Sequence, residues 1–158
     1  MNRTTLLATA ALVAMMSLAA CSRGYKYSHY HSIGSNGWER NEEIIFTPPA
    51  VSTSANYEEM LGLRTNSSYP FTQLTLIVTQ QARPSGYTRC DTIEARLTDD
   101  DGLVTGHGIV HYHYLLPLPA ATLAQGDTLR VSLRHDMLRS PLRGVADVGF
   151  LLKETPVK

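Results

Sequence analysis

The chain has 158 residues with 14 basic and 14 acidic side chains, so its formal net charge at pH 7 is zero. This balance gives no electrostatic case for binding nucleic acid or an anionic surface. The length suits a single domain with a hydrophobic core of its own.

Residues 1–20 have the parts of a secretory signal peptide: Arg3 near the start, an apolar run over 6–18, and small residues at the end. The apolar run is shorter than the about 20 residues that a membrane-spanning helix needs, so we expect a cleaved signal peptide. The sequence Leu18-Ala19-Ala20-Cys21 resembles the bacterial lipobox, in which the cysteine thiol takes up diacylglycerol. It predicts lipid attachment at Cys21. The alternative is an ordinary signal peptide followed by an unrelated cysteine.

Residues 21–41 are rich in Ser, Gly, Tyr and His, which predicts a lipidated N-terminus and an extended or loosely ordered tether. We expect Trp38 to be the point where the tether docks on the domain. The aromatic residues of this segment are either a strip that docks a partner or part of a tether resting on its own domain. They are Tyr25, Tyr27, Tyr30 and Trp38.

Residues 42–158 alternate apolar and polar side chains with period two, which is typical of half-buried strands. The clearest strand covers 71–79 and places Leu74, Leu76 and Val78 on the core face. A second covers 127–135 with Leu129, Val131 and Leu133 facing inward. Further strands are expected at 43–46, 57–64, 92–97, 103–114 and 145–153.

About seven or eight short strands separated by Gly and Pro turns predict an all-β domain, an antiparallel β-sandwich of jelly-roll-like form, over residues 42–158. Asp99-Asp100-Asp101-Gly102 is expected to be the hairpin turn that joins 92–97 to 103–114. One helical turn is expected at 119–123.

Two groups of side chains raise the question of a metal. His111 and His113 share one face of an expected strand, with His107 nearby, and could bind a metal if a third ligand such as His29 or His31 approached. Asp99-Asp100-Asp101 offers three carboxylates in a tight turn, but it lacks the spacing of an EF-hand loop. Solvated histidines and an ordinary turn explain both groups, so we expect no metal and no cofactor.

Enzymatic activity is not expected, because no G-x-S-x-G sequence occurs and adjacent carboxylates such as Glu58-Glu59 point to opposite faces of a strand. With Cys21 lipidated, Cys90 has no disulfide partner and is expected to be a half-buried strand residue. Arg64 ends a strand beside a polar loop. It could hold a carboxylate or an aromatic ring, or it could be a structural arginine that binds loop carbonyls.

The order and spacing of several short motifs resemble the GldH lipoprotein family of gliding motility in the Bacteroidetes. The motifs are the lipobox cysteine, Gly37-Trp38, Leu63-Arg64, Tyr69-Pro70-Phe71, Asp91-Thr92, Leu97-Thr98-Asp99 with Gly102, Met137-Leu138-Arg139, and the stretch from Leu142 through Gly144 and Asp147 to Gly149. The chain differs from the usual family pattern at Gln73, where an Asn is common, and at Val145, where an Ile is common.

The resemblance implies a non-enzymatic accessory component of the gliding or secretion machinery that binds other envelope proteins. Candidate interaction residues are Trp38, Arg64, Tyr69, Gly144 and Asp147. In this phylum, export to the cell surface is associated with acidic residues after the lipidated cysteine, whereas Ser22–Lys26 is basic. We therefore expect an outer-membrane anchor with the domain facing the periplasm. The alternative function is a small-ligand or glycan-binding envelope lipoprotein, which would need a concave sheet face carrying aromatic and polar side chains.

Overall fold

The computed structural model describes residues 24–155, so the expected signal peptide and Cys21 lie outside the described residues. Within this range the chain forms eight strands and no helix. Accordingly, residues 24–155 contain no helix that is long and apolar enough to cross a membrane.

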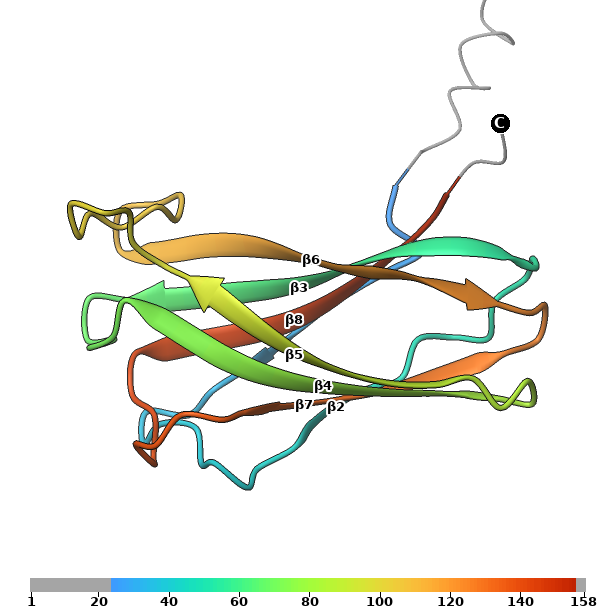
Figure 1. Ribbon diagram of the computed structural model, residues 1–158, viewed down its shortest axis with the longest axis horizontal. Coiled ribbons are helices and arrows are strands. Elements are labelled where there is room, and N and C mark those ends of the chain that lie inside the picture. Colours follow the sequence, from blue (N-terminus) through green and yellow to red (C-terminus); the bar gives the residue numbers. More distant parts are fainter. Residues whose placement is uncertain (1–23, 156–158) are drawn as a thin grey trace, which may run out of the picture.

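The strands form two antiparallel four-stranded sheets that face each other (Figure 1). The first sheet has the order β1-β8-β3-β6 and the second the order β2-β7-β4-β5. The pairs β1/β8, β2/β7, β3/β6 and β4/β5 show a long hairpin folded over on itself, which is a jelly roll. The predicted all-β sandwich is thereby confirmed. The bounds are β1 Tyr27–Ser32, β2 Ile44–Phe46, β3 Ala55–Asn66, β4 Gln73–Arg83, β5 Thr88–Arg96, β6 His111–Leu123, β7 Thr128–His135 and β8 Val145–Glu154.

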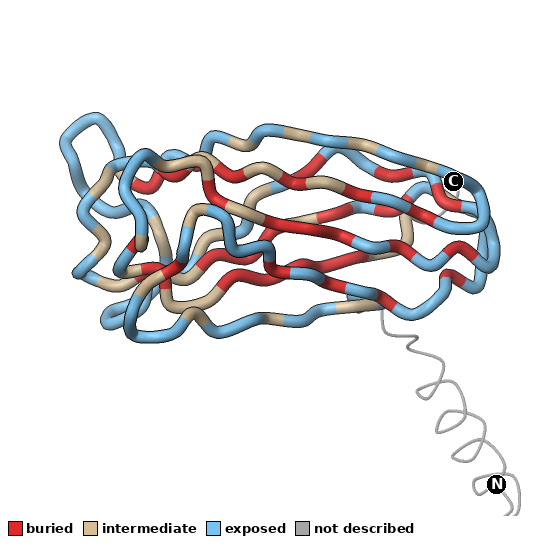
Figure 2. The backbone as a smooth tube through the Cα atoms, turned by 90° about the horizontal axis from the view of Figure 1, so that it is seen from below, coloured by how far each residue is buried: buried red, intermediate tan, exposed pale blue. Residues whose placement is uncertain are grey.

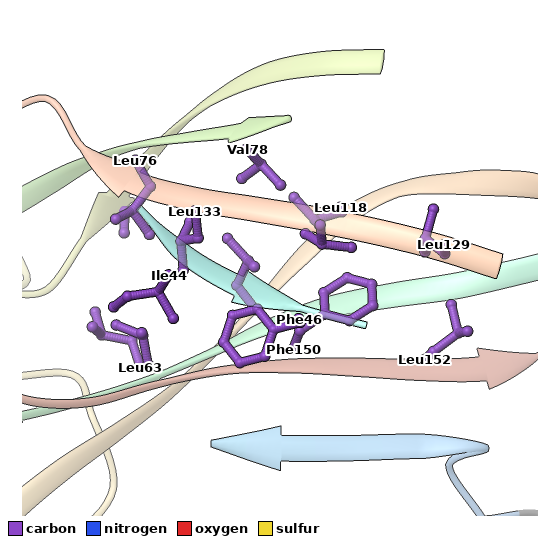
Figure 3. Close-up of a cluster of buried hydrophobic side chains, with 14 of the residues drawn as sticks. Ile44, Phe46, Leu63, Leu76, Val78, Leu118, Leu129, Leu133, Phe150 and Leu152 are labelled. Atoms are coloured by element: carbon purple, nitrogen blue, oxygen red, sulfur yellow. The ribbon is translucent and has the colours of Figure 1, made fainter. Parts of the chain in front are cut away.

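One hydrophobic core fills the space between the sheets (Figure 3). Phe46 of the second sheet lies beside Phe150 of the first, with ring centroids 6.2 Å apart. The inward faces that the alternation predicts are confirmed, because the inward apolar side chains of β4 and β7 are fully buried. These are Leu74, Leu76, Val78, Leu129, Val131 and Leu133.

The predicted hairpin between 92–97 and 103–114 is wrong. The aspartate turn forms, and Thr98 bridges Val104, but β5 pairs with β4 while β6 pairs with β3. Residues 97–110 therefore cross from the second sheet to the first. Turn chemistry sets the local reversal of the chain, whereas the sheet that each strand joins depends on distant partners.

The predicted helical turn at 119–123 is also wrong, because these residues belong to β6. Pro117 and Pro119 both lie within this strand. β6 lies at the edge of its sheet, where a strand tolerates residues that cannot donate a backbone hydrogen bond.

Part of the segment that we expected to be a loose tether is an ordered strand. β1 pairs with β8 over its whole length, from Tyr27 opposite Leu152 to Ser32 opposite Asp147. Its composition is polar because it is an edge strand whose residues are mostly exposed. The aromatic residues of the segment rest on the domain itself, which was one of the two alternatives.

The strands run between two groups of loops, and these define the ends of the molecule (Figure 1). We call the end where β1 starts and β8 finishes the anchor end; its loops cover residues 47–54, 84–87 and 124–127. The far end comprises 33–43, 67–72, 97–110 and 136–144. Figure 2 shows exposed residues at both ends and buried segments along the strands between them.

A charged network interrupts the apolar core near β5. Glu59, which is 1% exposed, accepts hydrogen bonds from Gln80 at 2.7 Å and from Arg89 at 2.8 Å. Arg89 also binds Asp91 at 2.6 Å. Among residues 24–155, Oε1 of Glu59 and Oε1 of Gln80 find no hydrogen-bond partner. Burial raises the pKa of Glu59 above its ordinary value, and the hydrogen bonds from Gln80 and Arg89 offset this only in part.

This raised pKa predicts a pH dependence of stability. The folded protein binds a proton on Glu59 more readily than the unfolded chain, so Glu59 lowers the free energy of unfolding as pH rises from the ordinary value of 4.5 through the raised pKa. In Glu59→Gln this loss should be absent, so the free energy of unfolding of the variant should rise relative to that of the wild type between pH 4 and 8. Urea denaturation of both proteins over this range measures the difference. A difference that is constant with pH would contradict the prediction.

Candidate functional site

Two of the candidate residues, Arg64 and Asp147, lie side by side on the outer face of the first sheet. They are register partners on β3 and β8, and their charged groups are 3.5 Å apart. Asp147 also accepts a hydrogen bond from the Ser32 hydroxyl at 2.6 Å. Arg64 donates to Nδ1 of His113 at 3.2 Å. Arg64 thus binds neighbouring side chains. The alternative that it binds loop carbonyls, which the sequence left open, is not what the structure shows.

Tyr30 completes this cluster because its ring lies against two glycines. Gly62 and Gly149 are register partners, and a Cβ atom at either position would lie within 3 Å of the Tyr30 side chain. The Arg64 guanidinium carbon lies over the ring, 4.7 Å from its centroid. Burial raises the pKa of Tyr30, and the Arg64 charge lowers it by a smaller amount. The outer-face cluster, Tyr30, Ser32, Arg64, His113 and Asp147, is therefore a set of groups that satisfy one another.

Tyr69 and Gly144 are also brought together, at the far end. Gly144 has a φ of 86°, and a Cβ atom there would lie 2.2 Å from the backbone nitrogen of Tyr69. The Tyr69 hydroxyl donates to the Gln73 carbonyl at 2.7 Å, and burial raises its pKa. Both residues hold the 67–72 loop against the start of β8.

Trp38 is placed in the core, not on the surface. It is 0% exposed and forms a two-way backbone bridge with Leu142, with N···O distances of 3.0 and 2.8 Å. Its ring packs edge-on against buried His135 at 5.1 Å, and its indole nitrogen donates to the Glu42 carbonyl. Burial lowers the pKa of His135. Trp38 therefore fastens the 33–43 loop to the 136–144 loop and offers no area to a partner.

The side chains that raised the question of a metal are separated or already bonded. β1 and β6 are opposite edges of the first sheet, so His29 and His31 lie about 14 Å from the histidines of β6, at about 4.8 Å per strand. The Asp99 carboxylate accepts hydrogen bonds from the backbone of Asp101 and Leu103, and Asp100 pairs with Arg96. Among residues 24–155, no three His, Cys, Asp or Glu side chains converge as metal ligands would.

The far end exposes large apolar side chains that the sequence analysis missed. Ile109 is 93% exposed, Val110 70% and Leu138 94%, and Leu103 and Val104 are also exposed. The predicted single strand over 103–114 would bury about half of these side chains, and is wrong for 103–110, which form a loop. The glycines at 102, 106 and 108 were the available signal that this stretch is a loop. Four of these side chains share the 97–110 loop, and exposed apolar patches commonly mark a protein interface.

Comparison with known proteins assigns the chain to a family. The family described as GldH lipoprotein matches residues 25–152. The chain belongs to the GldH lipoprotein family. This confirms the resemblance that the motifs had indicated, and it supports a lipid-anchored protein of the cell envelope.

Two GldH relatives align over most of their length. The gliding motility lipoprotein GldH of Flavobacterium johnsoniae is 27% identical over 150 residues, which cover 90% of this chain and 93% of that protein. A GldH homologue of Christiangramia forsetii is 25% identical over 146 residues, covering 87% and 88%. Among solved structures, the CBM35 from Cellvibrio japonicus Abf62 matches at a TM-score of 0.37 with 12% identity, covering 88% of this chain and 96% of that one.

The close approach at Gly144 predicts a stability difference between two glycines of equal φ. Gly126 has a φ of 87° and open space where a Cβ atom would lie, so Gly126→Ala should lower the free energy of unfolding by about 1 kcal/mol through backbone strain alone. Gly144→Ala adds the collision with Tyr69 and should lose about 1–3 kcal/mol more. Urea denaturation measures the free energy of unfolding of both variants. Equal losses would contradict the prediction, because they would show that the 67–72 loop shifts to accommodate the added Cβ atom without cost.

Proposed function

We propose that this GldH protein is a membrane-anchored, non-enzymatic component of the gliding-motility or associated secretion machinery, which binds another envelope protein through its far end. The relatives named for gliding motility support the setting. Lipid on Cys21 would supply the anchor, and the sandwich would supply the binding surface.

The observation that carries this proposal is where the family motifs lie. Gly37-Trp38, Tyr69-Pro70-Phe71, Leu97–Gly102, Met137-Leu138-Arg139 and Leu142–Gly144 belong to sequence-distant segments, yet all of them meet at the far end. Their buried members, such as Trp38 and Leu142, hold the loops in place. Exposed Leu138 on the 136–144 loop, and Ile109 and Val110 on the 97–110 loop, then present apolar side chains to a protein partner from two parts of this end.

The outer-face cluster does not favour the alternative of glycan binding. It combines an aromatic ring with polar groups, as a sugar site would, but Arg64 lies over the Tyr30 ring and is bonded to Asp147 and His113. A sugar would have to displace these contacts before it could stack on the ring. The cluster is better explained as the means by which β1 is held on the sheet.

The binding surface can be tested with charged substitutions and a matched control. Ile109→Asp combined with Leu138→Asp should weaken recovery of the partner complex from detergent-solubilised envelopes at least about tenfold, because buried apolar anchors dominate interface energy. Ile45→Asp is the control, since Ile45 is a half-exposed apolar residue on β2 and lies outside the far-end loops. Thermal unfolding should show that all variants fold.

Photo-crosslinking identifies the partner in the same experiment. A photoreactive amino acid at Ile109 should give an adduct with an envelope protein, and one at Ile45 should not. Recovery of free lipoprotein alone, without any adduct at the far end, would remove the main support for this function.

The side of the membrane is a separate part of the proposal. The basic Ser22–Lys26 segment after the lipid cysteine supports a domain that faces the periplasm from the outer membrane. Protease added to intact cells should therefore leave the domain uncut, whereas protease added after the outer membrane is permeabilised should remove it. Digestion on intact cells would place the domain on the cell surface instead.

A further inference from the structure

The structure leaves very little chain between the lipid and the folded domain. The tether expected over 21–41 is in fact shortened by β1, and the Lys26 backbone nitrogen already donates to the Leu152 carbonyl at 2.7 Å. Tyr25 contacts Met60 through its hydroxyl, 3.7 Å from the sulfur. Only three residue steps separate Cys21 from Gly24, and a chain spans at most about 3.6 Å per residue, so their Cα atoms lie within about 11 Å of each other.

The start of β1 lies toward the same end of the sandwich as the loops of the anchor end (Figure 1). They are also bonded to one another. Val51 donates to the Asp127 carbonyl, Gln125 to the Ser54 hydroxyl, and Ser85 to the Asp127 carboxylate at 2.9 Å. The anchor end is therefore a single linked surface, and its loops cannot move independently of one another.

The charges of this surface suit phospholipid headgroups. Asp127 is 0% exposed and its carboxylate accepts hydrogen bonds from backbone nitrogens, while Glu154 pairs with Lys26 at 3.2 Å. The loop residues around them are small or uncharged, including Pro49, Ala50, Ser52 and Gln125. The far end, by contrast, exposes Asp99-Asp100-Asp101. Headgroup phosphates would meet no exposed, unpaired carboxylate among the described residues of the anchor end.

We infer that the anchor end rests directly on the phospholipid bilayer, so that the sandwich stands upright and holds its far end at a fixed height. The occupant of the anchor end is thus a lipid surface. β6 runs from one end to the other over 13 residues, which at about 3.3 Å each places the far end about 40 Å from the membrane contact. This inference rests on the proposed lipid anchor at Cys21.

The orientation can be measured on the full lipidated protein in vesicles of phosphatidylethanolamine and phosphatidylglycerol. In a Cys90→Ser background, Gln125→Cys and Asp101→Cys each place one fluorophore at an exposed loop tip, the first at the anchor end and the second at the far end. Lipids with a nitroxide on the headgroup should quench the Gln125 label strongly and leave the Asp101 label nearly unchanged. Equal quenching of the two labels would overturn the inference.

A lengthened tether provides the matched control. Insertion of about 20 Gly and Ser residues after Ser22 adds a flexible span of about 25 Å, and should reduce quenching at Gln125 to the level at Asp101. Persistent quenching at Gln125 in this variant would show that the anchor end binds lipid by itself, which also supports the bilayer as its occupant. Mass spectrometry of the same sample reports the lipid on Cys21. Its absence would overturn the proposed anchor and this inference together, whereas equal quenching with lipid present would overturn the inference alone.

Discussion

The pairing of β1 with β8 is the interaction on which the rest of the structure depends. It places residues 27–32 directly on β8, a central strand of the first sheet, so only a few residues separate the proposed lipid site at Cys21 from the core. It also carries Tyr30 across Gly149 to Gly62 and sets Ser32 beside Asp147. Without β1, β8 would become an edge strand and the outer-face cluster would lose two of its members.

The polar groups of the molecule serve this architecture. The Arg64–Asp147 pair holds β3 and β8 in register with β1 beside them, and Trp38 and Gly144 close the far-end loops over the core. The buried Glu59 network is the exception, since two of its oxygens have no partner among residues 24–155 and the carboxyl is costly to ionise there.

The sequence predicts the parts of this fold that depend on local pattern. The alternation in Leu74–Val78 and Leu129–Leu133 marks the core faces correctly, because a strand buried on one face needs apolar side chains at every second position. It fails where distant partners decide. β1 is polar because it is an edge strand. Trp38 is buried by the 136–144 loop, which is distant in sequence but adjacent in the jelly roll. Ile109 is exposed because residues 97–110 cross from one sheet to the other. Arg64 and Asp147 are recognisable from family motifs, but only pairing in the sheet makes them neighbours.

The two ends together define how such a protein would work. A flexible tether of 20 residues would let the domain sample many heights and orientations. This lowers the effective concentration of its binding surface at any one height. The short connection that we infer would confine the far end to a thin layer parallel to the bilayer. A partner that is itself held in the membrane would meet Ile109 and Leu138 at the same height in every encounter, so less orientational freedom is lost on binding. The length of the strands, and not any single residue, then sets the distance over which the anchored domain can act.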